Sequence, residues 1–269
     1  IPLTFFFWFN YSSYGNPLQL SGTVERSIEV KADGSPYLET EVMKKRLKAN
    51  GQPKIIPQKS AVGGFNSRQI MNGFYIHFIS PDRGMLMYAP VMLFGFAGLL
   101  LALKRKMKYT ALLVAVIGFN ILLYSMWDDP YGGWAFGSRY LIPTYAILSI
   151  FIAYLLTQLS RYNLLLLLFF SIYTYSISVN TLGAITSNRN PPQVEAVSLT
   201  KETGRDEQYT YVRNMNELNA NNSKSFVLQS FAKNYITAWN YYIYITSFIT
   251  MVSAFLLMTF KKVTKGVKH

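Results

Sequence analysis

The chain has 269 residues, of which 51% are hydrophobic and only 14% are charged, a composition that favours a membrane protein over a soluble domain. The formal net charge of +13 would suit a nucleic-acid partner, but no basic helix or RNA-binding signature is present, so no nucleic acid is expected to bind. The lack of cysteine excludes disulfides and thiolate chemistry, and the two distant histidines do not have zinc-site spacing.

The chain opens with an aromatic run, IPLTFFFWFN, that is too short to cross a bilayer by itself. Residues 1–12 are therefore predicted to be the end of a truncated transmembrane helix, and the chain to be the C-terminal part of a longer protein. A signal peptide would need a basic n-region and a small-residue cleavage site, which this run does not contain.

Residues 13–84 are predicted to form a long polar loop outside the cytoplasm. Alternation around Ser27 to Lys31 indicates a short strand, and a helical pattern from Tyr37 to Leu47 is ended by glycine and proline. His77 lies in the apolar stretch GFYIHFIS at the end of this loop. It is interpreted as a partly buried or interfacial histidine rather than a catalytic one.

Residues 85–185 are predicted to contain four transmembrane helices. The uncharged run from Met85 to Leu103 would cover about 28 Å as a helix, close to one hydrocarbon core. A second long polar loop, 186–234, with a helical stretch from Asp206 to Leu218, precedes a fifth helix at 235–260. The remaining spans of the four-helix region are Tyr109–Trp127, Tyr140–Leu159 and the stretch that begins at Tyr162.

Basic residues predict how these helices are oriented. The connection from Lys104 to Lys108, Arg161 and the tail 261–269 all fall on one side of the membrane if the five spans alternate. The positive-inside rule places that side in the cytoplasm, and the tail can also attract anionic lipid headgroups. The sequence therefore predicts an all-α polytopic protein of the cytoplasmic (inner) membrane, with both long loops outside.

Two short polar clusters stand at the outer ends of predicted spans. One is SPDRG, from Ser80 to Gly84, and the other is DDPYGGWAFGSRY, from Asp128 to Tyr140. Glycine or proline interrupts the helix in both. Because the planar arginine fork can donate two parallel hydrogen bonds to a phosphate, Arg83 and Arg139 are candidates to hold a lipid-linked phosphate.

Other interpretations of these clusters are open. Arginines at span ends often only extend to the interface, and Trp134 and Tyr140 also suit an aromatic belt. Asp128 and Asp129 could act as a general base, a metal ligand or a partner for Arg139. A supporting salt bridge is favoured, and no metal is expected, because no third acid lies nearby to complete a metal site.

Three stretches, FNYSSYGNPL, SPDRGMLMYAPVMLFGFAGLL and WDDPYGGWAFGSRYLIPTYAIL, resemble multi-pass glycosyltransferases of the GT-C superfamily from bacteria and archaea. The look-alikes are relatives of dolichyl-phosphate-mannose protein mannosyltransferase and aminoarabinose transferase. Their motifs SPxRGL-x-x-YxP and W-x-GG-x-x-FGxRYL-x-P are similar to Ser80–Pro90 and Trp127–Pro143. The resemblance covers residues 11–150.

The resemblance implies an enzyme of cell-envelope glycosylation, which takes a sugar from a polyprenyl-phosphate donor and gives it to an unidentified acceptor outside the cytoplasm. It implies that Arg83 and Arg139 bind the donor phosphate and that Trp134 and Tyr140 shape the pocket. The lipid-linked sugar would be a co-substrate, and no cofactor is assigned.

The resemblance also implies that the catalytic acid lies in a first outer loop upstream of Ile1, so no residue of this chain is assigned as the catalytic base. Asp82 occupies a position that is often small in the family, and it is grouped with Asp128 and Asp129 as a supporting residue. A non-catalytic membrane scaffold or assembly subunit is the alternative. A transporter is less favoured because the predicted spans contain no charged residue.

Overall fold

The computed structural model describes residues 2–15, 17, 27–30, 36–38, 65–159, 162–204 and 206–266. The chain divides into two compact units, Ile1–Asn66 and Ser67–His269.

In the first unit, the aromatic run forms helix α1 (Pro2–Tyr14), whose large apolar side chains are exposed. Gly15 ends the helix in a left-handed conformation (φ 69°) and donates its N–H to the carbonyl oxygen of Tyr11 at 2.9 Å. A helix is therefore confirmed where the truncated helix was predicted. Its 13 residues cover about 20 Å, less than one hydrocarbon core.

The first unit also contains a two-stranded antiparallel ribbon. Strand β1 (Ser27–Val30) pairs with β2 (Pro36–Leu38), with Glu29 opposite Tyr37. The strand predicted from alternation is confirmed as β1. The helix predicted to begin at Tyr37 is wrong at its start, where the chain is in β2, and residues 39–47 lie outside the described residues.

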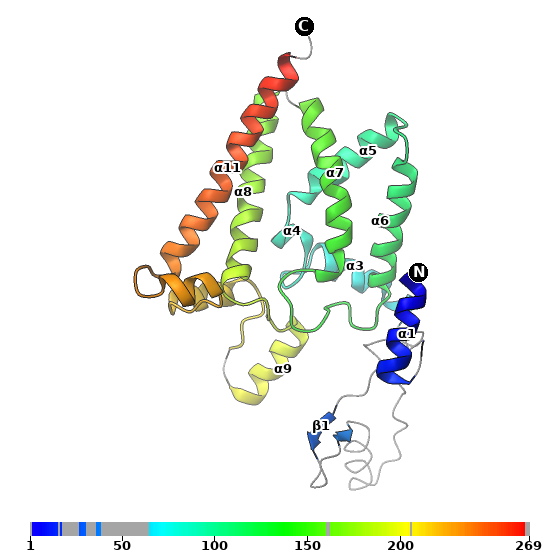
Figure 1. Ribbon diagram of the computed structural model, residues 1–269, viewed down its shortest axis with the longest axis vertical. Coiled ribbons are helices and arrows are strands. Elements are labelled where there is room, and N and C mark those ends of the chain that lie inside the picture. Colours follow the sequence, from blue (N-terminus) through cyan, green and yellow to red (C-terminus); the bar gives the residue numbers. More distant parts are fainter. Residues whose placement is uncertain are drawn as a thin grey trace. The chain divides into compact units, whose positions relative to one another are not determined.

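In the described part of the second unit long helices alternate with irregular connections, and Figure 1 shows the long helices side by side. In chain order its helices are η2 (Ser67–Gln69), α3 (Ile70–Phe78), α4 (Met85–Tyr88), α5 (Met92–Lys104), α6 (Thr110–Ser125), η3 (Arg139–Leu141), α7 (Ile142–Leu159), α8 (Asn163–Ile185), α9 (Gln193–Thr203), α10 (Val212–Asn219), the π-helical η4 (Leu228–Ala232) and α11 (Ala238–Gly266).

Three helices of this unit are long and apolar enough to cross a membrane, and they indicate a membrane protein. They span Arg139–Leu159, Asn163–Ile185 and Ala238–Thr259, which are 21, 23 and 22 residues long. At 1.5 Å per residue these lengths correspond to about 32, 35 and 33 Å. Helices α5 and α6 are also apolar but have only 13 and 16 residues, so the predicted count of five full spans is not established by length.

The run from Met85 to Leu103, predicted as one span, is broken into α4 and α5. Helix α4 ends at Tyr88, the backbone of Ala89 (φ −147°, ψ 54°) is not helical, and α5 begins two residues after Pro90. Proline has no N–H group and disfavours a helical conformation in the residue before it, so the break falls where the sequence places Pro90.

Side chains of α8 satisfy the backbone groups that the break leaves unpaired. The Asn180 amide donates to the carbonyl oxygen of Tyr88 at 2.7 Å, and the Ser176 hydroxyl accepts the N–H of Val91 at 3.3 Å. An unpaired backbone group at membrane depth costs several kcal/mol, so these contacts allow the broken helix to remain inside the bundle.

Small residues let α5 and α7 pack closely. A Cβ atom at Gly95 would lie 2.8 Å from the Leu148 Cβ, and one at Gly98 would overlap the carbonyl oxygen of Phe151. Close backbone approach through glycine is a common way for helices to associate in membranes. The buried cluster around this contact comprises Leu99, Ala102, Ile117, Ile121, Leu141, Leu148 and Phe151.

Two predicted loops contain folded helices. Helix α3 was predicted as part of the outer loop 13–84, but it packs on α6, where a Cβ at Gly73 would overlap the backbone of Ser125. In the second loop, the helix predicted over Asp206–Leu218 is α10, which begins later, at Val212. A second apolar cluster, containing Leu182, Ile185, Leu218, Leu228 and Ala238, packs α10 against the ends of α8 and α11.

Candidate functional site

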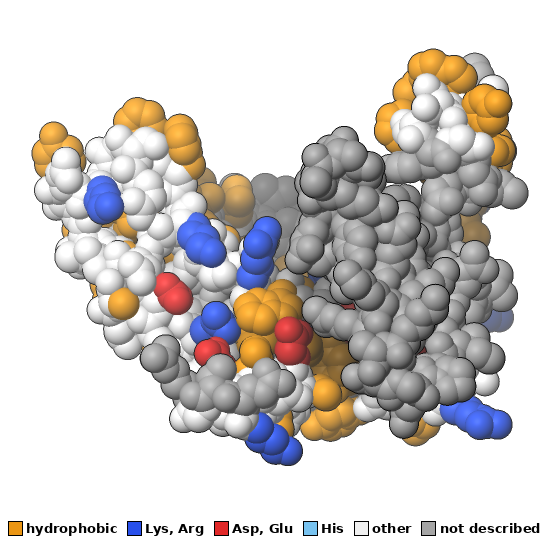
Figure 2. Space-filling view, turned by 90° about the horizontal axis from the view of Figure 1, so that it is seen from below, with side chains coloured by type: hydrophobic (Ala, Val, Ile, Leu, Met, Phe, Trp, Pro, Cys, Tyr) orange, Lys and Arg blue, Asp and Glu red, His pale blue; other side chains and the backbone are white. Residues whose placement is uncertain are grey.

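Three connecting segments of the second unit are held together by hydrogen bonds. They are residues 79–84 before α4, residues 126–138 before η3 and residues 186–192 before α9. On the described part of the face in Figure 2, seen from below Figure 1, Lys and Arg side chains are interspersed with Asp and Glu around hydrophobic side chains. The predicted site residues lie in or next to these segments: Asp82, Arg83, Asp128, Asp129, Trp134, Arg139 and Tyr140.

Arg83 is fully buried, and backbone carbonyl groups surround its guanidinium. Nε donates to the oxygen of Tyr131 at 3.1 Å, and Nη2 donates to the oxygens of Gly133 and Asn190, each at 2.9 Å. Nη1 donates to the carbonyl oxygen of Asp82 at 2.8 Å. Arg83 therefore joins all three segments, and it has no exposed N–H group to offer to a phosphate.

The charges around Arg83 show which groups lie near it. Burial lowers the pKa of the Arg83 guanidinium below its ordinary value, and the negative charges of Asp82 and Asp129 oppose this change. The positive charge of Arg139 lowers the pKa further. The two arginines predicted from the sequence therefore lie close enough to repel each other electrostatically.

Asp82 is a buried carboxylate that holds the start of α9. Its Oδ2 accepts the N–H of Gln193, the first residue of α9, at 3.0 Å, and its Oδ1 accepts the Ser80 hydroxyl. A carboxylate at a helix N-terminus satisfies a free N–H group and complements the helix dipole. Asp82 thereby links the SPDRG segment to the second long loop.

Arg139 is exposed, in contrast to Arg83. Its guanidinium lies over the Tyr140 ring, 5.4 Å from the ring centroid, and a Cβ at Gly132 would lie 2.9 Å from its Nε. Gly132 and Gly133 have φ values of 71° and 64°, which a side chain would disfavour. The glycine pair thus forms a turn in which the Gly133 carbonyl oxygen accepts a hydrogen bond from Arg83 and Gly132 packs against Arg139.

The Tyr140 ring, on which Arg139 lies, is fixed by two other rings. It stacks on Tyr124 with centroids 4.3 Å apart and an interplanar angle of 9°. The edge contact with His77 has a centroid distance of 6.2 Å. Aromatic contacts of this kind contribute about 0.5–1.5 kcal/mol each and restrict the orientation of the ring that supports Arg139.

His77 is buried and holds the residue that precedes Arg139. Its Nε2 lies 3.3 Å from the carbonyl oxygen of Tyr124, which can only accept, so Nε2 carries the proton. In the neutral ring, Nδ1 then accepts the Ser138 hydroxyl at 2.8 Å. Burial lowers the pKa of His77 and favours this neutral form. The predicted burial of His77 is confirmed, and the side chain is fully enclosed rather than interfacial.

Trp134 lies between α9 and α10. Its indole N–H donates to Glu195 Oε2 at 2.7 Å, and the guanidinium of Arg213 lies 5.5 Å from its ring centroid. Arg213 also pairs with Glu207 at 3.5 Å. The Trp134 side chain, 41% exposed, is thus oriented by contacts to both loop helices.

Residues 135–137 of the second polar cluster pack against the membrane helices. A Cβ at Gly183 would lie 2.6 Å from the Phe136 ring, so glycine in α8 makes room for this side chain. Phe136 also contacts Tyr88 edge to face, at 4.9 Å between centroids. Gly137, with φ 66°, lets the chain turn directly beside the Tyr88 ring. This packing fixes the backbone two residues before Arg139.

Two buried asparagines order the segment before α9. Asn190 donates to Asn214 Oδ1 at 2.7 Å and to the carbonyl oxygen of Thr210 at 3.1 Å. Asn214 donates to the Thr186 hydroxyl at 2.9 Å and to the carbonyl oxygen of Ser187 at 2.6 Å. Because buried amides without partners are costly, this complete donor set specifies one conformation of the loop.

Asp128 and Asp129 are both exposed. The negative charge of Asp129 raises the pKa of Arg83. The predicted salt bridge to Arg139 does not form among the described side chains. The described residues also contain no group of three or more His, Cys, Asp or Glu that could hold a metal ion.

Sequence reasoning missed the residues of the second long loop that complete the site. Glu195, Arg213, Asn190 and Asn214 lie in a stretch predicted only as polar loop with one helix. One local signal was present, because Asn190 precedes two prolines and Glu195 follows in the first turn of a helix, where acids are favoured. Their partners could not be inferred, since they lie in other segments.

Comparisons with known proteins give no family match: no protein-family model, no curated protein and no solved structure matches the chain. The function is therefore inferred from the residues and their geometry.

Proposed function

We propose that the protein is a membrane glycosyltransferase that moves a sugar from a polyprenyl-phosphate donor to an acceptor outside the cytoplasm. The observation that carries the proposal is the exposed Arg139 guanidinium, which lies over Tyr140 at the start of a span-length helix. A cation at this position is suited to a phosphate attached to a lipid, because the phosphate would lie at the interface while the lipid chain follows the helix.

The surroundings of Arg139 support a phosphate site. Its guanidinium is open to solvent, and the glycine turn beside it presents no side chain that would block an approaching anion. Trp134 offers a partly exposed ring for a sugar. Arg83 adds positive charge from below the turn, although its N–H groups are taken by carbonyl oxygens.

In the proposed reaction, the acceptor hydroxyl oxygen forms a bond to the anomeric carbon, and the bond from that carbon to the donor phosphate oxygen breaks. The electron pair leaves on the polyprenyl phosphate, where Arg139 stabilises the developing negative charge. A general base takes the hydroxyl proton. Asp128 and Asp129 are not assigned that role.

The proposal includes a topology of five spans, formed by α4 with α5, α6, α7, α8 and α11. The connection from Lys104 to Lys108 and the tail 261–269 then lie in the cytoplasm, and the segments that hold Arg139 and Trp134 lie outside. Together α4, the break and α5 run from Met85 to Lys104, or about 30 Å if the rise were helical throughout.

The experiment that tests the proposal is substitution of Arg139 in the complete protein, reconstituted in vesicles with a labelled polyprenyl-phosphate sugar. Arg139→Ala should lower turnover at least tenfold, which corresponds to about 1.4 kcal/mol of lost transition-state stabilisation. Arg139→Lys should retain part of the activity, because it keeps the charge but loses the planar fork.

The matched control is Arg189→Ala, which removes another exposed arginine from the same group of segments. It should leave turnover unchanged. Equal activity of Arg139→Ala and the original protein would contradict the site assignment. Binding of polyprenyl phosphate without turnover in any condition would instead favour the scaffold or assembly subunit.

A further inference from the structure

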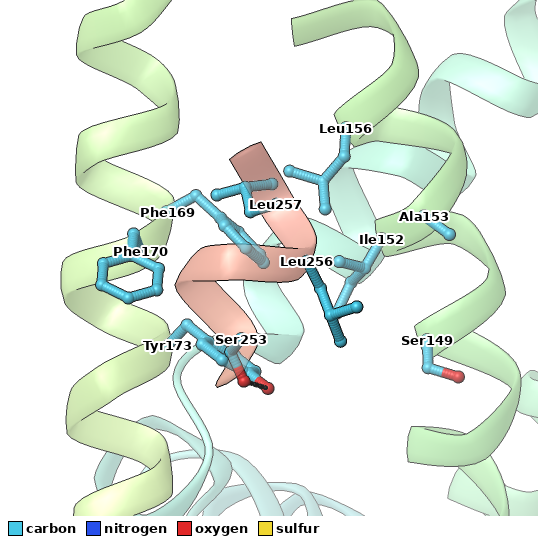
Figure 3. Close-up of a pocket in the computed structure, with 10 residues that line it drawn as sticks. All are labelled: Ser149, Ile152, Ala153, Leu156, Phe169, Phe170, Tyr173, Ser253, Leu256 and Leu257. Atoms are coloured by element: carbon cyan, nitrogen blue, oxygen red, sulfur yellow. Dashed lines mark hydrogen bonds between the residues drawn. The ribbon is translucent and has the colours of Figure 1, made fainter. Parts of the chain in front are cut away.

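The three span-length helices enclose an apolar groove that is separate from the Arg139 site. The groove has a volume of about 350 Å³ and is lined by residues 149–156 of α7, 169–173 of α8 and 253–257 of α11. Figure 3 shows leucine, isoleucine and phenylalanine side chains from the three helices around it. Its volume lies within the range of about 300–1,000 Å³ that is typical of ligand pockets.

The groove offers no unpaired polar group to a ligand or to water. The Tyr173 hydroxyl and Ser253 Oγ are bonded to each other at 3.1 Å, as Figure 3 shows. The Ser149 hydroxyl donates to the carbonyl oxygen of Ala146 at 2.7 Å. An apolar cavity of this kind is not stabilised by ordered water, which needs two to four polar partners, so a hydrocarbon is the suitable occupant.

Basic residues lie close to one end of the groove. Lys104, Arg105, Lys106 and Lys108 are all exposed in the connection that follows α5. At the end of α7, Gln158 accepts a hydrogen bond from the exposed Arg105 at 3.0 Å. Figure 1 shows that α5, α7 and α11 end at the same side of the unit. An apolar groove with exposed cations near one end matches a lipid that has an anionic headgroup.

We propose that this groove holds an acyl chain of an anionic glycerophospholipid, whose phosphate lies at the basic end near Arg105. This lipid is distinct from the proposed glycosyl donor. Arg139 precedes Ser149 by ten residues, so the donor phosphate would lie about 15 Å away along α7, toward the opposite end.

The first test fills the groove with a larger side chain. The full chain is reconstituted in nanodiscs that contain equal amounts of phosphatidylglycerol and phosphatidylcholine, and retained lipid is counted by native mass spectrometry. One phosphatidylglycerol per chain should be retained. Ala153→Phe, which places a ring in the groove, should lower the retained fraction at least tenfold, while Ala146→Phe, two turns earlier on the same exposed face, should not.

Equal retention by Ala153→Phe and the original chain would overturn the proposal. Equal retention of phosphatidylcholine would overturn the anionic headgroup. A further set of nanodiscs also contains polyprenyl phosphate, at the same concentration as phosphatidylglycerol. If Ala153→Phe removes polyprenyl phosphate instead of phosphatidylglycerol, the assignment to a glycerophospholipid is wrong.

The second test adds no bulk to the groove itself. Because the chain has no cysteine, Thr157→Cys, one turn beyond Ala153 at the end of the groove, and Leu112→Cys on the exposed face of α6 can each carry one fluorophore. Phosphatidylglycerol with brominated acyl chains should quench the probe at 157 at least twofold more than the probe at 112. Brominated phosphatidylcholine should show no such difference. Equal quenching at both positions would contradict a bound acyl chain.

Discussion

At the scale of single residues, Arg83 and Arg139 have the same side chain and opposite surroundings. Arg83 is enclosed, and four of its five N–H groups donate to the carbonyl oxygens of Asp82, Tyr131, Gly133 and Asn190, whereas Arg139 is open to solvent. A buried guanidinium with this many hydrogen bonds stabilises the loops that surround it, and its removal leaves several carbonyl groups without donors. Substitution of Arg83 should therefore lower the stability of the fold, whereas substitution of Arg139 should lower turnover.

Arg83→Lys is expected to lower the free energy of unfolding by about 3 kcal/mol, because one ammonium group cannot reach carbonyl groups on three segments. Thermal unfolding in a constant detergent measures the change. Arg105→Lys, an exposed control, should change stability by less than about 0.5 kcal/mol. If Arg83→Lys were as stable as the original chain but lost donor binding, Arg83 would be a ligand residue after all.

The sequence was sufficient to single out both arginines as candidates to bind a phosphate, but it could not separate their roles. The partners of Arg83 are 48, 50 and 107 positions away, and all are backbone oxygens, which every residue type supplies. No local pattern therefore distinguishes an arginine that binds a ligand from one that closes a loop. The turn residues were more informative, because adjacent glycines at 132 and 133 indicate positive φ values, and the structure has them.

At the scale of elements, the long uncharged runs were predicted well. The predicted span Tyr140–Leu159 differs by one residue at its start from Arg139–Leu159, and the stretch from Tyr162 corresponds to Asn163–Ile185. Length and lack of charge alone determine such helices. The break at Pro90 was missed because the hydrogen bonds that stabilise it come from α8. Ser176 and Asn180 accept and donate the hydrogen bonds that stabilise the break, and they are about 90 positions away.

The contact of α5 with α7 gives a matched pair of glycine substitutions. Gly98→Ala should destabilise the fold by about 1–3 kcal/mol, because the added Cβ overlaps the carbonyl oxygen of Phe151. Gly118→Ala in α6, where a Cβ meets nothing within 4 Å, should be neutral or stabilise by up to about 1 kcal/mol through helix propensity. Thermal unfolding compares the two, and equal effects would show that α5 and α7 are not in close contact.

At the scale of the whole molecule, the proposed topology predicts that the α5–α6 connection and α9 lie on opposite sides of the membrane. Single cysteines can replace the exposed Lys106 and Lys201, since the chain has no cysteine of its own. In intact cells, a membrane-impermeant maleimide should label Lys201→Cys at once and Lys106→Cys only after permeabilisation. Labelling of both in intact cells would contradict an odd number of spans between them.

The buried arginine has a consequence for the energetics of ligand binding. Arg83, Asp82 and the paired asparagines already order the segments around Arg139 in the folded protein. The conformational entropy of these segments is therefore lost during folding and not during binding. An arriving anion therefore has to immobilise one side chain rather than a loop, so about 0.5–1.5 kcal/mol of its binding energy is lost to ordering instead of several. Association at Arg139 should accordingly proceed as docking to a rigid surface, with little rearrangement of the backbone between the free and the bound protein.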